Sequence, residues 1–510
     1  MKTVRYPLLS YALAGLVAAC VPGACVAAPP RSTVPMFAKP ARTVVGRYDS
    51  ADIIELKFRS DDRTHRQDGR WVSRTRGPLP ALDALSAAGG PVVGVERLFP
   101  DAVLPTAAEA FAGGQPALAQ WYRLHLRAGA DIGRLVDRLN AMDAVEIAYP
   151  APLPAPAPAA TAVVGPAASP SFSERQGYAR PASSSGIDAD YARTVPGGDG
   201  AGIRVVDVEY SWNWQHEDLQ RLRVPGTWIR NGTIHDPFND TDHGTAVMGE
   251  MVADDNAFGI RGLVGAATPH YVNVTSREGG YNPARAIALA ASAVGAGDVI
   301  LVEQQIPGPG PCGNFVALEY LPAVYDAVVS AVRRGIHVVE AAGNGNVSLD
   351  HPCFGGAFPR GMPDSGAIIV GAGGAQPMPW CTDRVRPRAR QGFSSYGRRV
   401  NLQGWGQCVA ATGYGDMHNG GYNARYTRVF SGTSSASPIV ASAVVAVSGV
   451  ARARGITLSP RQMRDLLVAT GTPQVGTDGH IGPLPDLRAA ITRLAEPEKP
   501  EPCAATGSRP

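Results

Sequence analysis

The chain has 510 residues, of which 45% are hydrophobic and 18% are charged, proportions typical of globular proteins rather than of disordered or fibrous ones. At roughly 150 residues per domain, this length predicts about two or three folded units. The formal net charge of +3 is too small for the basic surface by which proteins bind nucleic acid. We therefore expect a folded protein with no nucleic-acid partner.

The beginning of the chain has the three parts of a secretory signal. Two basic residues precede an apolar run over residues 8–21, and small residues follow at 26–28. The run is too short to cross a bilayer. We expect a signal peptide over residues 1–28, a secreted or periplasmic protein and no membrane span. The alternative is a lipid anchor at the cell envelope, because the residues before Cys20 resemble the lipobox of bacterial lipoproteins.

The cysteines agree with export. Five of the seven follow residue 28, and four of these fall in one interior stretch, which predicts two disulfides in an oxidising compartment. Other pairings remain open, but we favour Cys312 with Cys353 and Cys381 with Cys408, which close short loops. The close pairs typical of a zinc site are missing from the sequence, so we expect no metal centre of that kind.

A first folded unit is predicted over residues 29–150. Hydrophobic and polar residues alternate at 54–59 and again at 122–127, as in half-buried strands. Asp131 is a good N-cap for the helix that follows, and strand spacing resumes at 145–149. Strand, helix and strand thus occur twice, which predicts a small α+β unit of ferredoxin-like type without a catalytic constellation.

A linker and a larger unit follow. Residues 151–180 are rich in Ala and Pro, which predicts an extended, exposed linker open to proteolysis. Over 181–496, short β-rich runs alternate with helical stretches, a pattern that predicts an α/β fold: a parallel β-sheet with helices on both faces. The charged, Pro-rich tail over 497–510 is predicted to be disordered. The β-rich runs are 203–206, 271–274, 299–302, 337–339 and 368–370, and the helical stretches are 284–295, 316–334 and 435–452.

Three segments of the larger unit carry reactive side chains where such a sheet gathers functional residues, at the carboxyl ends of its strands. Asp207 follows an apolar run, and a carboxylate there needs a partner. His243 begins a helical stretch and can exchange a proton near neutral pH. Ser434 precedes an apolar helix, whose free N–H groups suit capping or an oxyanion. Taken singly, each residue also has an ordinary structural explanation.

Together the segments resemble the subtilisin-like serine peptidases. The strand-end Asp207, the box HGTAVMG from His243 and the box GTSSASP around Ser434 follow the family's order, and AAGN, ending at Asn344, is similar to its oxyanion segment. The resemblance covers about residues 186–494. It implies that Ser434 is the nucleophile, His243 the base and Asp207 the residue that orients the imidazole. It also implies an oxyanion site made by Asn344 and the N–H of Ser434, and chemistry that needs no metal or cofactor.

The resemblance also gives the first unit a role. Many members of the family carry a folded pro-region that inhibits the enzyme until it is removed, which implies that residues 29–150 act as an intramolecular inhibitor. We place maturation between Ala151 and Ala182. The sequence as a whole indicates a secreted, monomeric serine endopeptidase that acts on protein or peptide substrates and is made as a self-inhibited precursor.

Two departures from the family pattern leave points open. Val208 and Glu209 follow Asp207, where relatives usually have a small hydroxyl residue and Gly. Glu303 opens the segment EQQ, where the substrate-binding strand usually has a Ser-x-Gly element. Glu303 either favours basic substrate side chains or is a surface carboxylate without such a role. The alternatives are an inactive, peptidase-like binding protein and the related Ser-Glu-Asp peptidases, against which the HGT box argues.

A cluster of acidic residues raises the possibility of a calcium site. Asp236, Asp240 and Asp242 lie close together in the sequence, and relatives often bind calcium. The ligand register of a calcium loop is not recognisable here. We therefore interpret the cluster as solvated acidic turns and expect no cofactor.

Overall fold

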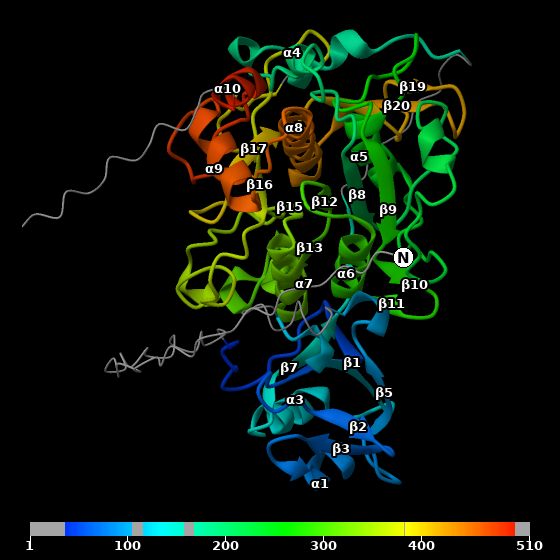
Figure 1. Cartoon of the computed structure of the whole chain (residues 1–510), viewed down its shortest axis with the longest axis vertical. Coiled ribbons are helices and arrows are strands. Elements are labelled where there is room, and N and C mark those ends of the chain that lie inside the picture. Colours follow the sequence, from blue (N-terminus) through cyan, green and yellow to red (C-terminus); the bar gives the residue numbers. More distant parts are fainter. Residues whose placement is uncertain (1–35, 105–115, 158–167, 382, 495–510) are drawn as a thin grey trace, which may run out of the picture. The chain divides into compact units, whose positions relative to one another are not determined.

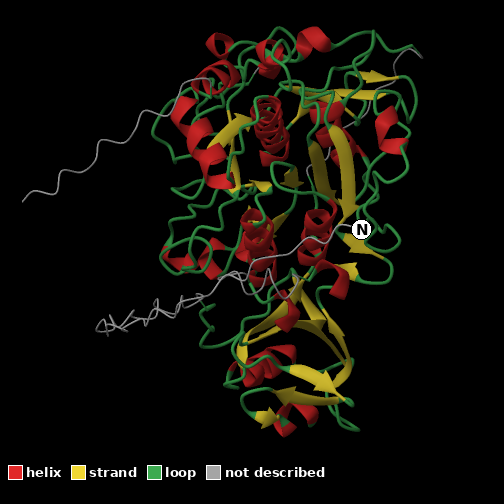
Figure 2. Cartoon of the chain, in the orientation of Figure 1, coloured by secondary structure: helices red, strands yellow, loops and turns green. Residues whose placement is uncertain are grey.

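The computed structural model describes residues 36–104, 116–157, 168–381 and 383–494. The predicted signal peptide, Cys20 and the predicted tail over 497–510 lie outside these ranges. Figure 1 shows the course of the chain, and Figure 2 marks its helices and strands.

The N-terminal part forms a four-stranded antiparallel sheet in the order β5-β6-β1-β7. The sheet carries the helix α3 (Ile132–Asn140) between β6 and β7, and the short helix α1 (Pro80–Asp83) precedes β5. This is the strand order of a ferredoxin-like unit, so the predicted α+β fold is confirmed. The strands are β1 (Asp49–Phe58), β5 (Val92–Arg97), β6 (Trp121–Leu126) and β7 (Val145–Pro152), and a small sheet comprises β2 (His65–Gln67), β3 (Arg70–Ser73) and β4 (Gly77–Pro78).

The helix α3 begins and packs as its sequence predicts. The Asp131 side chain accepts a hydrogen bond from the backbone N–H of Arg134, which satisfies one free donor of the first turn. Apolar residues at helical spacing then point to one side and are buried against the sheet. They are Ile132, Leu135, Val136 and Leu139.

The larger part is built on a six-stranded sheet in the order β17-β16-β15-β12-β8-β9, in which every neighbouring pair is parallel. This confirms the predicted doubly covered parallel sheet. Its strands are β8 (Arg204–Glu209), β9 (Thr268–Asn273), β12 (Val299–Val302), β15 (His337–Ala341), β16 (Ile368–Gly373) and β17 (Leu402–Trp405).

Helices cover both faces of this sheet (Figures 1 and 2). The helices α5 (Asp242–Val252) and α8 (Thr433–Ala453) pack on one face, and α6 (Pro283–Ala293) and α7 (Pro322–Arg333) on the other. The two faces divide the residues of β8 by alternation: Val205 belongs to the first core, and Val206 and Val208 belong to the second. This alternation decides where each polar residue of β8 points.

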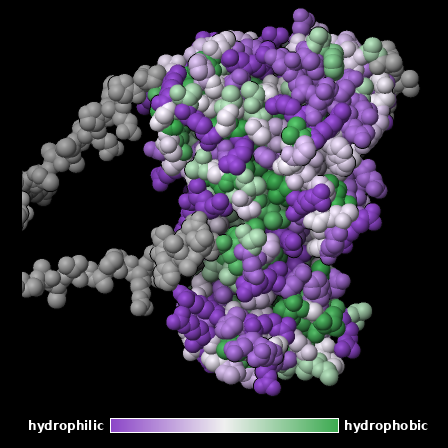
Figure 3. Space-filling model, turned by 45° about the vertical axis from the view of Figure 1, so that its right-hand side comes forward, coloured by the Kyte–Doolittle hydropathy of each residue, from purple (hydrophilic) through white to green (hydrophobic). Residues whose placement is uncertain are grey.

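Within the described residues, α8 alone is long and apolar enough to cross a membrane. The 18-residue stretch of α8 that meets this criterion is completely buried inside the protein. It is the central helix of the core, in contact with β12, β15, β16 and β17. In the view of Figure 3, hydrophilic side chains cover much of the surface, and hydrophobic groups gather near the middle. The apolar face of α8 is thus used for packing.

Shorter elements complete the larger part. The predicted disulfides between Cys312 and Cys353 and between Cys381 and Cys408 are both formed. The shorter elements are α4 (Ala189–Ala192), α9 (Pro460–Thr470), α10 (Leu487–Arg493), β10 (Thr275–Ser276), β11 (Gly280–Tyr281), β13 (Gln305–Pro307), β14 (Phe315–Ala317), β18 (Val409–Thr412), β19 (His418–Asn419) and β20 (Arg425–Phe430).

The described beginning of the predicted linker is less exposed than its composition suggests. The strand β7 continues to Pro152, and Ala155 is only 4% exposed. Both the N–H and the carbonyl of Ala155 hydrogen-bond to the hydroxyl of Tyr210, which directly follows β8. The prediction of an exposed linker is therefore wrong for Ala155, which Tyr210 binds, whereas Leu153 and Pro156 are exposed.

Candidate active site

The functional candidates gather at the carboxyl ends of neighbouring strands, as parallel sheets favour. Glu209 is the last residue of β8, Glu303 follows β12, and Asn344 lies shortly after β15. His243 and Ser434 come from the first turns of α5 and α8. His243, Glu303 and Ser434 line one pocket.

The closest polar contact of this group joins His243 to a glutamate. The imidazole Nδ1 lies 2.6 Å from Glu209 Oε2, and the two side chains are only 4% and 1% exposed. The other oxygen of Glu209 accepts hydrogen bonds from the backbone N–H of Tyr210 and from Gln304 Nε2, at 2.7 and 3.0 Å. Glu209 is thus held in place on both oxygens, and it fixes the orientation of the imidazole.

The buried ion pair sets the proton affinity of the imidazole. Burial by itself lowers the pKa of His243, but the charge of Glu209 and its hydrogen bond outweigh burial, so that the pKa lies above its ordinary value. The opposite ring nitrogen, Nε2, is buried and has no hydrogen-bond partner among the described residues. His243 therefore has one nitrogen anchored by a carboxylate and one free to take a proton.

Asp207, the carboxylate predicted for this role, does not contact His243. Its Oδ2 accepts a hydrogen bond of 2.7 Å from the indole of Trp212, and burial, reinforced by the charge of Glu209, raises its pKa well above the ordinary value. The reason is geometric. Asp207 and Glu209 point to the same face of β8, but Asp207 lies two residues, about 6.6 Å, back from the strand end. The acid beside His243 is Glu209.

Sequence reasoning missed Glu209, although a signal for it was present. A strand that alternates through Arg204–Glu209 places the side chains at 207 and 209 on one face, with 209 at the carboxyl end. The position of the strand end, rather than the residue type, decides which carboxylate reaches the site.

Ser434 lies at the second position of α8 and is 6% exposed. Gly432 precedes the helix with φ +101°, and a Cβ there would come within 3.3 Å of the Asn344 amide, which explains why glycine is needed. The single hydroxyl proton of Ser437, one turn further, is shared between the carbonyl of Thr433 and Glu303 Oε1. The hydroxyl of Ser434 thus lies at a helix N-terminus, in the pocket that His243 also lines.

Asn344 is fixed from two sides. Its Oδ1 accepts a hydrogen bond of 2.8 Å from the backbone N–H of Thr433, the residue before Ser434. Its backbone N–H and its Nδ2 donate to Gln305 Oε1, at 2.9 and 3.2 Å. An amide group held in this way leaves one N–H of Nδ2 free to donate to a developing oxyanion.

Two further glutamates lie buried near the site. Burial raises the pKa of Glu303 well above its ordinary value, although hydrogen bonds from Ser437 and Ser434 partly oppose that shift. Burial also raises the pKa of Glu250, on α5, well above the ordinary value, and neither of its oxygens has a partner among the described residues. Burial therefore disfavours the charged form of both groups, and Glu303 is a buried group rather than a surface carboxylate.

The N-terminal part of the chain reaches this pocket. Ala155, Pro156 and Ala157 line it together with His243 and Ser434. The carbonyl of Pro156 accepts a hydrogen bond of 3.4 Å from Gln305 Nε2. A polypeptide segment of this same chain therefore lies against the candidate catalytic groups.

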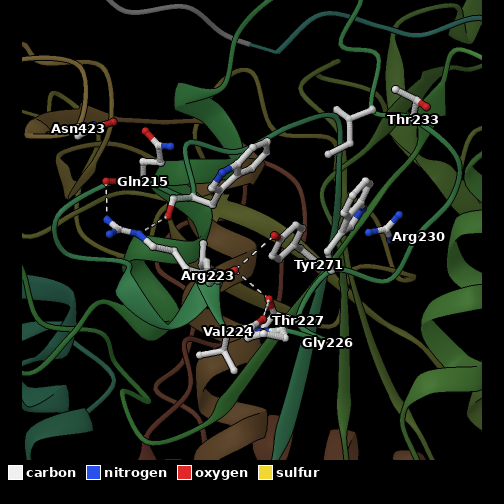
Figure 4. A pocket seen from close by; sticks show the side chains of 14 residues that line it. Gln215, Arg223, Val224, Gly226, Thr227, Arg230, Thr233, Tyr271 and Asn423 are labelled. Atoms are coloured by element: carbon white, nitrogen blue, oxygen red, sulfur yellow. Dashed lines mark hydrogen bonds between the residues drawn. The ribbon is translucent and has the colours of Figure 1, made fainter.

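A larger pocket, of about 900 Å³, lies elsewhere, beside the edge strand β9 (Figure 4). Arg223 donates to backbone carbonyls of the loop that contains Gln215, and the hydroxyl of Tyr271 donates to a backbone carbonyl of the same pocket wall. The candidate catalytic residues do not line it. The chemistry points to the smaller pocket, because reactive groups converge there.

The acidic residues considered for calcium have partners both within their own loop and outside it. Asp236 accepts from Ser211 Oγ and from the backbone N–H groups of Phe238 and Asp240. Asp240 accepts from the N–H of Asp242, whose carboxylate lies 3.6 Å from Arg425. These three aspartates are half-buried, and their hydrogen bonds to backbone N–H groups are those of turns.

Comparisons with known proteins show the family to which the chain belongs and agree with the fold. Residues 198–483 match the Subtilase family. The chain is 26% identical over 301 residues to subtilisin NAT of Bacillus subtilis subsp. natto, covering 56% of this chain and 68% of that protein. It is also 26% identical to the subtilisin of Bacillus pumilus over 274 residues, covering 54% of this chain and 85% of that protein.

A solved structure shows the same fold. Fervidolysin from Fervidobacterium pennivorans, described as a keratinolytic enzyme related to subtilisin, superposes with a TM-score of 0.54 at 18% identity, covering 90% of this chain and 63% of that one. The family match extends over more than half of the chain and includes Glu209, His243, Asn344 and Ser434. The protein belongs to the subtilase family of serine peptidases.

Proposed function

We propose that the protein is an endopeptidase in which Ser434, His243 and Glu209 act as the catalytic triad and Asn344 as an oxyanion donor. The observation that carries this assignment is the 2.6 Å contact of Glu209 Oε2 with His243 Nδ1. It leaves Nε2 of the same ring in the pocket that Ser434 lines. The substrates are proteins or peptides.

The reaction follows from this arrangement. Ser434 Oγ attacks the carbonyl carbon of the substrate while its proton passes to His243 Nε2, and Glu209 stabilises the imidazolium that forms. The oxyanion accepts hydrogen bonds from Asn344 Nδ2 and the N–H of Ser434. When the C–N bond breaks, the proton on Nε2 passes to the leaving amine. Water then hydrolyses the acyl-enzyme by the same proton route and restores the Ser434 hydroxyl.

We further propose that the N-terminal unit is an intramolecular inhibitor. A buried ion pair and a hydrogen bond join the N-terminal sheet to the larger part: Lys57 Nζ lies 2.9 Å from Asp326 on α7, and the indole of Trp121 donates to the same carboxylate. Arg123 donates to the carbonyls of Gly279 and Tyr281. These contacts support an inhibitor that positions residues 155–157 in the active site until they are cleaved.

We also propose that the protein is exported from the cytoplasm. The signal-like beginning of the chain and the two disulfides, Cys312–Cys353 and Cys381–Cys408, both favour a protein that works in an oxidising compartment outside the cytoplasm. Sequencing the N-terminus of the exported protein distinguishes a secreted form from one anchored by lipid at Cys20.

Labelling with a fluorophosphonate, followed by peptide mass spectrometry, tests the proposed function. We expect the self-processed protein to be labelled at Ser434 and the full-length Ser434→Ala variant to remain unlabelled and unprocessed. An unlabelled Ser434 after the N-terminal unit has been removed would instead favour a binding protein without turnover.

A further inference from the structure

One side chain connects the bound segment to the oxyanion donor. Gln305, the first residue of β13, accepts hydrogen bonds on Oε1 from the N–H and the Nδ2 of Asn344, at 2.9 and 3.2 Å. Its Nε2 donates to the carbonyl of Pro156, at 3.4 Å. Gln305 is thus in contact with the polypeptide in the active site and with the group that would bind the oxyanion.

The pocket around this segment is nearly full. With Ala155, Pro156 and Ala157 in place, the cavity that remains has a volume of about 10 Å³. That is about the space of a single water-sized sphere, whereas a cavity that accepts a benzene ring measures about 150 Å³. A substrate side chain much larger than a methyl group therefore has to displace part of the pocket wall.

Glu303, beside Ser434, is buried. It is 5% exposed, and its Oε1 accepts a hydrogen bond from Ser437. Burial also raises the pKa of its carboxyl group well above the ordinary value, which disfavours the charged form. A buried carboxyl group that Ser437 already engages is poorly placed to pair with a lysine or arginine side chain of a substrate. The pocket is therefore small, and Glu303 does not select a basic residue.

From this geometry we propose that Gln305 limits the peptidase to segments with small side chains, of the Ala-Pro-Ala kind, on the acyl side of the cleaved bond. The proposal rests on the proposed function and specifies its substrate class. The Gln305 amide narrows the pocket, binds the substrate backbone through Nε2 and acts as a positioning residue for Asn344 through Oε1. The chain's own segment satisfies this requirement, and we infer that processing cleaves directly after Ala157.

The test uses the enzyme obtained by self-processing of the full chain and two p-nitroanilides, succinyl-Ala-Ala-Pro-Ala and succinyl-Ala-Ala-Pro-Phe. We expect kcat/KM for the alanine substrate to exceed that for the phenylalanine substrate by at least about tenfold, about 1.4 kcal/mol. Gln305→Gly should reduce this ratio at least tenfold, because it opens the pocket, and should lower kcat for the alanine substrate, because Asn344 loses its acceptor.

Gln305→Glu is the matched control. It keeps the size of the side chain and an acceptor for Asn344, but it replaces the donor to the carbonyl of Pro156 with an oxygen. The alanine-to-phenylalanine ratio should stay within threefold of the wild-type value, while KM rises. If Gln305 had only a structural role, both variants would change the amount of folded enzyme. The alanine-to-phenylalanine ratio would then not fall in Gln305→Gly while KM alone rises in Gln305→Glu.

A second measurement does not depend on how the Gln305 variants fold. In the full chain, Ala157→Phe should slow self-processing at least tenfold, and Ala157→Ser should not, and the processed protein should begin with the residue after Ala157. Equal processing of the two Ala157 variants, or an unchanged substrate ratio in Gln305→Gly, overturns the inference. If Ser434 is still labelled in that case, the proposed function stands. Loss of fluorophosphonate labelling in the wild-type enzyme overturns the proposed function as well.

Discussion

Replacing Glu209 with glutamine tests the assignment of the triad acid. At 2.6 Å from His243 Nδ1, a full negative charge stabilises the imidazolium by about 6 kcal/mol at an effective dielectric constant of about 20. The glutamine oxygen still accepts a hydrogen bond, so part of this energy is retained. With about 1.4 kcal/mol for each tenfold change in rate, kcat should fall by about 10³ to 10⁴, the size of effect expected for a triad acid.

The matched control is Asp207→Asn. Burial raises the pKa of Asp207 well above its ordinary value, which disfavours a charge there, and an asparagine oxygen still accepts the hydrogen bond from Trp212. Because the imidazole of His243 is held by Glu209 and not by Asp207, kcat should change less than about tenfold. Initial rates on a chromogenic peptide, normalised to the concentration of labelled Ser434, measure both variants. A large loss in Asp207→Asn together with a small loss in Glu209→Gln would refute the assignment and restore Asp207.

The remaining predictions concern pH, the oxyanion and stability. Because the pKa of His243 is raised above 6.5 and the base must be neutral, kcat/KM should fall as the pH drops through a midpoint above 6.5, which a pH–rate profile measures. Asn344→Ala should lower kcat by about 10² to 10³ with little change in KM, as steady-state kinetics would show; a loss below tenfold contradicts the oxyanion role. Glu250 has a raised pKa in the folded state, so it binds a proton that the unfolded chain releases, and its contribution makes stability fall as pH rises above about 4.3. Glu250→Leu should therefore raise the denaturation midpoint at pH 8 more than at pH 5, and equal shifts at the two pH values would contradict a neutral buried acid. Replacing both Cys381 and Cys408 with serine should lower the free energy of unfolding by about 2 to 4 kcal/mol in denaturant titrations.

The sequence predicts the architecture well because its signals are local and repeated. The alternation of β-rich runs with helical stretches predicted the parallel sheet, and the N-cap at Asp131 predicted the start of α3. The strand β17, Leu402–Trp405, was not predicted, because its LQGW sequence lacks β-branched residues and contains a glycine. Patterns of this kind identify helices and strands. They predict the position of a single side chain only where they also define the end of the helix or strand that carries it.

The candidate site depends on contacts that local patterns do not contain. His243, Asn344 and Ser434 come to one edge because each lies beside the start or the end of a predicted element. The exchange of Asp207 for Glu209 depends on where β8 ends, which residue preferences define poorly. The burial of Ala155 depends on the Tyr210 hydroxyl, distant in sequence, and so composition alone predicted an exposed linker.

The contact between Glu209 and His243 can be measured directly by proton NMR of the processed enzyme with ¹⁵N-labelled histidine. A short hydrogen bond to a carboxylate shifts the Nδ1 proton far downfield, so a strongly low-field resonance should be present in the wild-type enzyme and in Asp207→Asn, and absent in Glu209→Gln. A resonance that survives in Glu209→Gln and disappears in Asp207→Asn would contradict the account.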